Sequence, residues 1–212
     1  MRKTKEEAYQ TRCNLLAAAL TVFYERGVSK ASLDEIAKTA GVTRGALYWH
    51  FKNKKDLFEA LFQIHYANVE QQLEQVLHSD QTTEPLDFLY NSVLQHFESL
   101  VNDHDFRKFN TILLYRCEQT QDNLSIVELT RQYHRRWDLL LHNIINECKR
   151  KQILDQKLNT ERAVLSLIST ISGLSASWLD DPQAFDLMQH APAIIQACFD
   201  NLKNSPFLRD TA

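Results

Sequence analysis

The sequence predicts an all-α protein, and three observations lead to that fold class. Gly and Pro occur only four times each among 212 residues, which leaves few turn signals for a fold of many short strands. Apolar residues recur three and four positions apart along most of the chain, as they do on one face of a helix. Residues that favour helix ends, such as Ser32, Gly41 and Asn53, separate these segments. Long helices joined by short loops fit all three observations.

The N-terminal quarter is expected to hold three helices. An apolar stripe predicts the first over residues 8–26. Ser32 can cap a second helix from Leu33 to Ala40, and Glu35, three residues on, would complete a capping box. A third, short helix is expected from Thr43 to about His50. Three short helices in succession, with a glycine between the second and third, form a recognisable unit.

The remainder is expected to be helical as well. Asn53 can cap a long fourth helix, and polar or Pro-containing segments separate it from those that follow. The predicted ranges are 54–78, 85–102, 105–118, 124–151 and 159–179, then a last helix ending near Asn204 and a loose tail over 205–212.

Residues 33–51 have the pattern of a helix-turn-helix. Gly41 can adopt a positive φ at the sharp turn without a Cβ clash. In the third helix Leu47 and Phe51 lie one turn apart, so both must point inward. The opposite side of that helix is centred on Trp49, which is therefore expected to be exposed.

This exposed side predicts DNA binding. Gly45 and Ala46 would let the helix approach base edges in a major groove, and Arg44 can pair with a guanine. Lysines follow where phosphates would lie, and the first 57 residues carry 11 basic against 6 acidic side chains although the whole chain has a net charge of −3. A hydrophobic protein partner is the alternative occupant of this face. The candidate DNA-binding residues are Ser32, Thr43, Arg44, Gly45, Ala46, Tyr48, Trp49, His50 and Lys54.

The run from Glu35 to Lys52 resembles the DNA-binding motif of the TetR family, and within it Val42 to Phe51 is similar to the AcrR type, which represses multidrug efflux pumps. Weaker similarity extends over Leu113–Glu118 and Ile171–Leu174. The resemblance implies a DNA-binding domain over residues 1–53 and a helical ligand-binding and dimerisation domain over 54–212. It also implies a repressor that leaves a palindromic operator when a small molecule binds.

Two late segments predict a homodimer. Residues 163–179 contain no charge, and the last helix is apolar over a wide arc. Helices that are apolar on more than one face have two surfaces to bury, and a single helix-turn-helix reads too few bases alone. Burial in the core of one subunit is the alternative. The resemblance implies a four-helix interface, and the candidate residues are Leu167, Ile171, Gly173, Leu174, Trp178, Ile194, Ile195, Cys198 and Leu202.

Aromatic residues between the fourth and eighth helices predict an effector cavity. We expect a bulky, lipophilic and cationic effector, since aromatic faces and enclosed carboxylates attract organic cations. Asp138 could instead pair with Arg135 or Arg131, and the chain has Tyr66 where the AcrR type has an acidic pocket residue. The candidate ligand-binding residues are Phe62, Tyr66, Glu70, Phe109, Glu118, Tyr133, Trp137 and Asp138.

Other functions are also considered. A TetR-like regulator of other genes could sense a lipid or metabolite, or no ligand. A helical enzyme has little support, because the sequence lacks a Gly-rich phosphate loop, Gly-x-Ser-x-Gly and His-x-x-x-His, so no catalytic residue, metal or cofactor is expected. No signal peptide and no run of 18 uncharged apolar residues is found. The four dispersed cysteines are expected to be reduced thiols in a cytoplasm.

Overall fold

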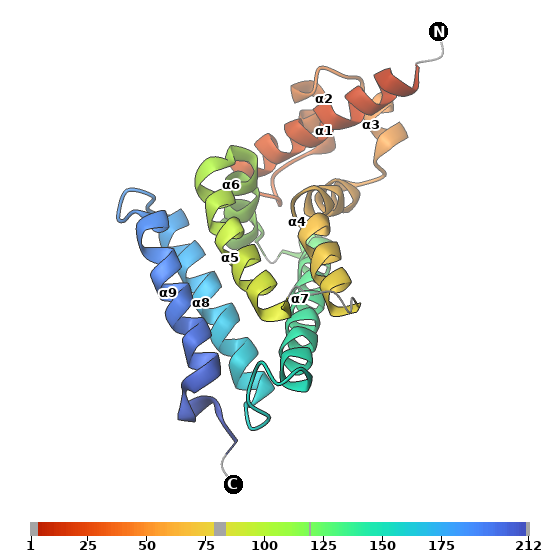
Figure 1. Cartoon of the computed structure of the whole chain (residues 1–212). Helices are drawn as coiled ribbons and strands as arrows, with labels where there is room; N and C mark the ends of the chain where they lie inside the picture. Colours follow the sequence, from red (N-terminus) through yellow and green to blue (C-terminus); the bar gives the residue numbers. More distant parts are fainter. Residues whose placement is uncertain (1–3, 79–83, 119, 211–212) are drawn as a thin grey trace. The chain divides into compact units, whose positions relative to one another are not determined.

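The computed structural model describes residues 4–78, 84–118 and 120–210. Within these ranges the chain is helical, and its only β pairing is one isolated bridge between Leu158 and Arg209, so the all-α fold class is confirmed. The α-helices (Figure 1) are α1 (Lys5–Arg26), α2 (Leu33–Thr39), α3 (Arg44–His50), α4 (Lys54–His78), α5 (Pro85–Asn102), α6 (His104–Thr111), α7 (Leu124–Arg150), α8 (Thr160–Asp180) and α9 (Leu187–Asn204).

The described chain divides into two compact units. The head unit contains the residues up to Ala67 and Asp105–Tyr133, and the body unit contains Asn68–His104 and the residues from His134 onward. Helix α4 begins in the head unit and ends in the body unit, and so does α7. The head unit therefore includes more of the chain than the three helices of the expected DNA-binding domain.

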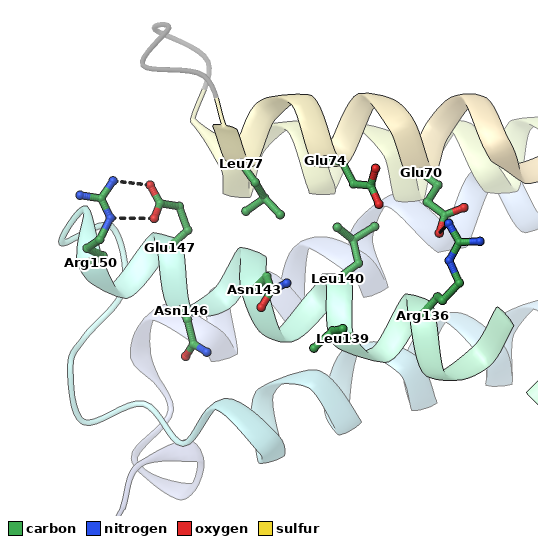
Figure 2. A pocket seen from close by; sticks show the side chains of 10 residues that line it. All are labelled: Glu70, Glu74, Leu77, Arg136, Leu139, Leu140, Asn143, Asn146, Glu147 and Arg150. Atoms are coloured by element: carbon green, nitrogen blue, oxygen red, sulfur yellow. Dashed lines mark hydrogen bonds and ion pairs between the residues drawn. The ribbon is translucent and has the colours of Figure 1, made fainter. Parts of the chain in front are cut away.

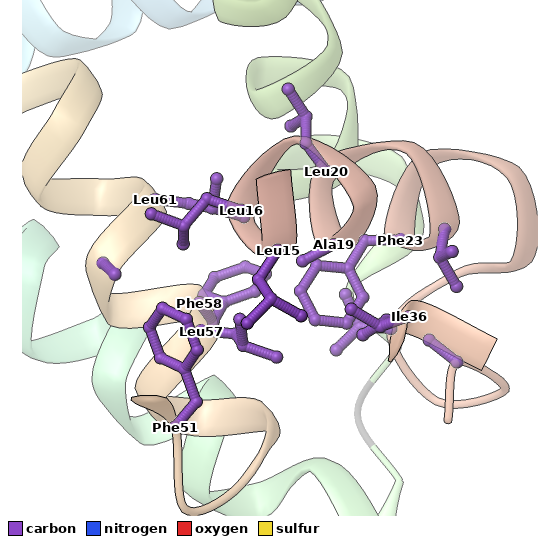
Figure 3. Packing of buried hydrophobic residues seen from close by; sticks show 14 of the residues in the cluster. Leu15, Leu16, Ala19, Leu20, Phe23, Ile36, Phe51, Leu57, Phe58 and Leu61 are labelled. Atoms are coloured by element: carbon purple, nitrogen blue, oxygen red, sulfur yellow. The ribbon is translucent and has the colours of Figure 1, made fainter. Parts of the chain in front are cut away.

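The core of the head unit joins α1, α2 and α3 to the first half of α4. Leu15 and Phe23 of α1, Ile36 of α2, Leu47 of α3 and Phe58 of α4 are all fully buried. Figure 3 shows the side chains of α1, α2 and α4 converging on this core, with Phe51 at its edge. Burial of these large apolar groups fixes the three short helices, which would not be stable alone.

The start of α1 and the capping of α2 differ from the sequence expectation. Helix α1 begins at Lys5 rather than at residue 8, because Thr4 forms a reciprocal capping box with Glu7. At the start of α2 the Ser32 hydroxyl accepts from the Glu35 amide (3.1 Å) as expected. The Glu35 carboxylate, however, pairs with Arg26 (3.0 Å) and thereby ties α2 to the end of α1.

The helix expected over residues 105–118 ends sooner and changes its winding. After α6 the residues Ile112–Arg116 form one π-helical turn, and the helix stops before Cys117. The Arg116 carbonyl accepts a hydrogen bond from the Val28 amide (2.9 Å). In a continuing helix this carbonyl would accept from an amide of the next turn. Here the Val28 amide, in the segment after α1, satisfies it instead.

The body unit is built around α5, α8 and α9, which pack together; Figure 1 shows α8 and α9 side by side. Tyr90 of α5 packs edge-to-face on Phe199 of α9 (5.2 Å between ring centroids). Helix α8 contains an 18-residue stretch of mean hydropathy 1.2, long and apolar enough by composition to cross a membrane, with 28% of it buried. Most of that stretch is therefore left uncovered within the chain.

The C-terminal tail is docked, contrary to the expectation of a loose end. The Asn159 amide donates to the Leu208 carbonyl (2.8 Å), and the Asp210 amide donates to the Lys157 carbonyl (3.0 Å). The Arg209 guanidinium donates to the carbonyls of Ser205 and Lys203 and pairs with Asp155. These contacts hold the tail through Asp210 against the start of α8.

Candidate functional site

The turn between α2 and α3 is closed by backbone hydrogen bonds. Gly41 has φ +67°, a conformation that L side chains rarely adopt. Its amide donates to the Lys38 carbonyl (3.1 Å), and the Val42 amide donates to the Ala37 carbonyl (3.0 Å), which is the Schellman pattern for ending a helix. Thr43 then caps α3 by accepting from the Ala46 amide (3.2 Å). The chain between the two helices is thus reduced to a sharp, rigid turn.

Helix α3 leaves an aromatic face in solvent, as expected. Trp49 is 73% exposed and Tyr48 is 43% exposed, while Leu47 on the opposite side is fully buried. A Cβ at Gly45 would meet nothing closer than the Thr43 hydroxyl at 3.9 Å, so another molecule can approach the backbone there. His50 packs edge-on against Trp49 (4.5 Å between centroids). The face is exposed and bordered by a cation.

That cation, Arg44, is already positioned by neighbouring side chains. Its guanidinium pairs with the Asp34 carboxylate of α2 (Nε to Oδ1, 3.1 Å; Nη1 to Oδ2, 3.3 Å). A third nitrogen, Nη2, donates to the Tyr48 hydroxyl (3.3 Å), and the guanidinium lies over the Tyr48 ring. These contacts limit the rotamers of a long side chain at the N-terminal end of α3. A buttressed guanidinium is suited to bidentate recognition of a planar acceptor.

Lys54, which was expected to reach a phosphate, lies elsewhere in the head unit. Its ammonium donates to the Val28 carbonyl (2.9 Å) and to the Ser29 carbonyl (3.2 Å), both in the segment after α1. Asn53 caps α4 as expected by accepting from the Asp56 amide (3.0 Å). Sequence spacing alone placed Lys54 beside the other lysines, but the side chain turns toward the protein.

Four of the expected effector-binding residues form a packed cluster in the head unit. Phe62 and Tyr133 stack face to face at 4.0 Å, and Phe109 packs edge-on to Phe62 at 5.1 Å. The Tyr66 hydroxyl donates to Asn110 Oδ1 (2.6 Å), and burial raises the pKa of Tyr66. Phe62, Phe109 and Tyr133 are buried. These rings pack against one another and form part of the hydrophobic core of the head unit.

A cavity of about 460 Å³ lies in the body unit, between the second half of α4 and the second half of α7. Figure 2 shows Glu70 and Glu74 of α4 facing Arg136 and Leu140 of α7. Glu70 is buried and pairs with Arg136 at 2.7 Å. Burial raises the pKa of Glu70, while Arg136 opposes that shift. The lining residues are Glu70, Glu74, Leu77, Arg136, Leu139, Leu140, Asn143, Asn146, Glu147 and Arg150.

The remaining candidate effector residues are not among those that line this cavity. Asp138 is half-exposed and pairs with His142 (3.5 Å), rather than with Arg135 or Arg131. Trp137 beside it is half-buried. Glu118 belongs to the head unit and is exposed. Its pKa is lowered mainly by a hydrogen bond with the Ser29 side chain. Of the eight expected residues, Glu70 is the one that this cavity contains.

The candidate dimer residues divide into two groups. Leu167, Trp178, Ile195, Cys198 and Leu202 are buried within the chain itself. Ile194 of α9 is 42% exposed, and Ile171 and Leu174 of α8 are half-buried. A Cβ at Gly173 would meet nothing within 4 Å, so this glycine faces outward.

Sequence reasoning missed several residues of these sites. Leu165 of α8 is 55% exposed and follows the same outward helical spacing as Gly173. Asp34 and Glu74 were not singled out from the sequence. The signal for Asp34 was its place in the helix that precedes Arg44. No sequence signal distinguished Glu74 from the other glutamates.

Two family models match the chain. Residues 15–61 match the model of bacterial regulatory proteins of the tetR family, and residues 84–204 match the C-terminal region of MAATS-type transcriptional repressors. The HTH-type transcriptional regulator TtgR of Pseudomonas putida is 36% identical over 214 residues, covering 99% of each chain. The HTH-type transcriptional regulator AcrR of Shigella flexneri is 35% identical over 220 residues, covering 100% of this chain and 98% of AcrR.

Solved structures of regulatory proteins resemble this chain as well. NalD, the secondary repressor of the MexAB-OprM multidrug efflux pump in Pseudomonas aeruginosa, superposes with a TM-score of 0.81 at 33% identity over 95% of this chain and 100% of NalD. SmeT of Stenotrophomonas maltophilia, solved as a complex with triclosan, has a TM-score of 0.82 at 26% identity over 95% of this chain and 96% of SmeT. The similarity therefore spans both compact units.

Proposed function

The chain belongs to the TetR family of bacterial regulatory proteins, and from this premise we propose that it is a homodimeric repressor released from a palindromic operator by a small lipophilic ligand. As a TetR-type transcriptional repressor it is related to regulators of multidrug efflux, and the relatives it matches are regulators rather than enzymes. We propose an efflux-pump gene as its target, since NalD and AcrR resemble it over nearly the whole chain.

The exposed aromatic face of α3 is the main observation that supports the proposal of DNA binding. Trp49 is 73% exposed beside an open glycine, and a free surface of this kind is unfavourable unless it meets a partner. In a major groove Gly45 and Ala46 would face base edges and Arg44 would pair with guanine, while Tyr48, Trp49 and His50 would donate to phosphates. Residues 1–53 would act as the DNA-binding domain, with Ser32 and Thr43 near the backbone.

Dimerisation is supported by what α8 and α9 leave uncovered. Leu165, Ile194 and the outward Gly173 lie on the two helices in which the sequence predicted an interface. A glycine with no neighbour within its own chain permits close approach of a second backbone. Two subunits would place two recognition helices about one DNA turn, roughly 34–36 Å, apart. The remaining candidates, such as Leu167 and Ile195, would support the interface from beneath.

The cavity between α4 and α7 supports an effector that carries a positive charge. Its lining contains three glutamates and two arginines, a formal net charge of −1. Glu70 pairs with Arg136, and Glu147 pairs with both Arg150 and Lys151, which leaves Glu74 as the lining carboxylate that a cationic ligand would meet. Leu77, Leu139 and Leu140 supply the apolar surface for a lipophilic body. Because α4 continues from the cavity into the head unit, a ligand that favours another position of α4 would change DNA affinity.

Calorimetric titration with ethidium tests the effector part. Glu74→Gln should weaken ethidium binding roughly tenfold, while Asp138→Asn, at a half-exposed carboxylate outside the cavity lining, serves as the matched control and should not change it. Equal affinity of Glu74→Gln and the parent, or tighter binding of a long-chain carboxylate than of ethidium, would contradict the cationic effector. Selection of duplexes from a random-sequence pool tests the DNA part, and a palindromic consensus is expected.

A further inference from the structure

The turn that follows α1, residues 27–29, is held on one side by the first residue of α4. The Lys54 ammonium donates to the Val28 carbonyl (2.9 Å) and to the Ser29 carbonyl (3.2 Å). Val28 is fully buried, and Ser29 and Lys54 are half-buried, so both contacts are partly shielded from water. A charged donor in such a setting forms a stronger bond than a neutral one. The turn leads directly into α2.

The same turn is held on its other side by the segment between α6 and α7. The side-chain Nδ2 of Asn123, a fully buried residue, donates to the Ser29 hydroxyl (2.7 Å). The Ser29 hydroxyl also lies 3.0 Å from the Thr120 hydroxyl, and the Val28 amide donates to the Arg116 carbonyl (2.9 Å). A Cβ at Gly27 would lie 3.0 Å from the Glu118 carboxylate, so the two segments are in close contact.

From these contacts we propose that Lys54 is a positioning residue for DNA binding rather than a phosphate contact. It fixes the turn from α4 while Asn123 fixes it from the α6–α7 segment, and the two together set where α2 and α3 lie on the head unit. An ammonium has three hydrogens to donate, and moving it to a phosphate would leave two carbonyls of the turn without this donor. This inference rests on the proposed docking of α3 in the major groove.

The dependence of operator affinity on salt separates the two roles of Lys54. Each lost phosphate contact lowers the slope of log affinity against log salt by about 0.9. We expect Lys54→Met to weaken binding of a duplex selected by the parent roughly tenfold at every salt concentration with an unchanged slope. Lys52→Met, at an exposed lysine two residues earlier, is the comparison for losing a charge near the DNA. A slope reduced by about 0.9 in Lys54→Met would overturn the proposal.

Hydrogen exchange of the DNA-free protein gives a second readout. The Val28 amide should exchange at least roughly tenfold faster in Lys54→Met and in Asn123→Ala than in the parent, and at the parent rate in Lys52→Met. Unchanged exchange at Val28 in both variants would also overturn the proposal. Asn123→Ala should further weaken operator binding with an unchanged slope, which keeps the test available if Lys54→Met does not fold. A parent that selects no duplex refutes the proposed function, whereas a lowered slope in Lys54→Met refutes this inference alone.

Discussion

The folding stability of the body unit is expected to depend on pH through His96. The His96 imidazole of α5 shares a hydrogen bond with the Ser175 hydroxyl of α8 (3.1 Å). Burial lowers the pKa of His96 from 6.5 to about 4, so folding favours the neutral ring. Below pH 6.5 the unfolded chain takes up a proton that the folded chain does not accept until the pH nears 4. Stability from this group is therefore complete above pH 6.5 and is lost as the pH falls toward 4.

The size of the effect follows from the two pKa values. At about pH 5 the unfolded side chain is almost fully protonated, whereas the folded one is mostly neutral. The folded state then loses about 2 kcal/mol relative to about pH 8. A change of that size is a large fraction of the stability of an ordinary domain, so it is measurable by urea unfolding followed by circular dichroism.

The comparison variant is His96→Gln, which can still hydrogen-bond to Ser175 but does not titrate. Its free energy of unfolding should fall by about 2 kcal/mol less than that of the parent between about pH 8 and pH 5. Both proteins share every other titrating group, so the difference isolates His96, provided that the protein concentration is matched. Parallel pH profiles for the two proteins would refute the assignment of a neutral imidazole to the folded state.

Three further outcomes are expected. Arg44→Ala should weaken operator binding by about 1–3 kcal/mol and relax the preference at one base pair, measured by anisotropy with singly substituted duplexes; a uniform loss over all positions would argue against base reading. Arg136→Met should destabilise the fold by about 1–3 kcal/mol in urea at about pH 7 because the buried Glu70 carboxylate loses the donor with which it pairs, and Glu70→Gln in that background should recover part of the loss. Gly173→Leu should yield monomers in sedimentation velocity, because a Cβ at this position meets nothing within 4 Å in its own chain but a leucine would overpack a partner; an unchanged dimer would exclude Gly173 from the interface.

Features governed by short-range chemistry were predictable from the sequence. Ser32, Thr43 and Asn53 cap helices where their side chains suggested it. Gly41 takes a positive φ at the expected turn, and Trp49 is exposed because Leu47 must face the core. Each inference needed only neighbours within a few positions along the chain.

Features governed by distant contacts were not predictable. Lys54 turns toward the carbonyls of residues 26 and 25 positions earlier in the chain, and no spacing rule distinguishes that from a phosphate contact. Phe62 and Tyr133 are far apart in sequence yet stack at 4.0 Å, so an aromatic-rich pattern could not separate core from cavity. The docking of Arg209 likewise depends on carbonyl groups that the fold brings to it.

Selection of DNA by the intact protein tests the central claim most directly. The protein is mixed with duplexes of random sequence at two salt concentrations, bound molecules are recovered over several rounds, and Arg44→Ala is processed in parallel. We expect the parent to enrich a palindrome whose half-sites are centred about one helical turn apart, with a fixed guanine that Arg44→Ala no longer selects. Recovery of unrelated sequences by the parent, or of the same palindrome with the same guanine by Arg44→Ala, would contradict the account.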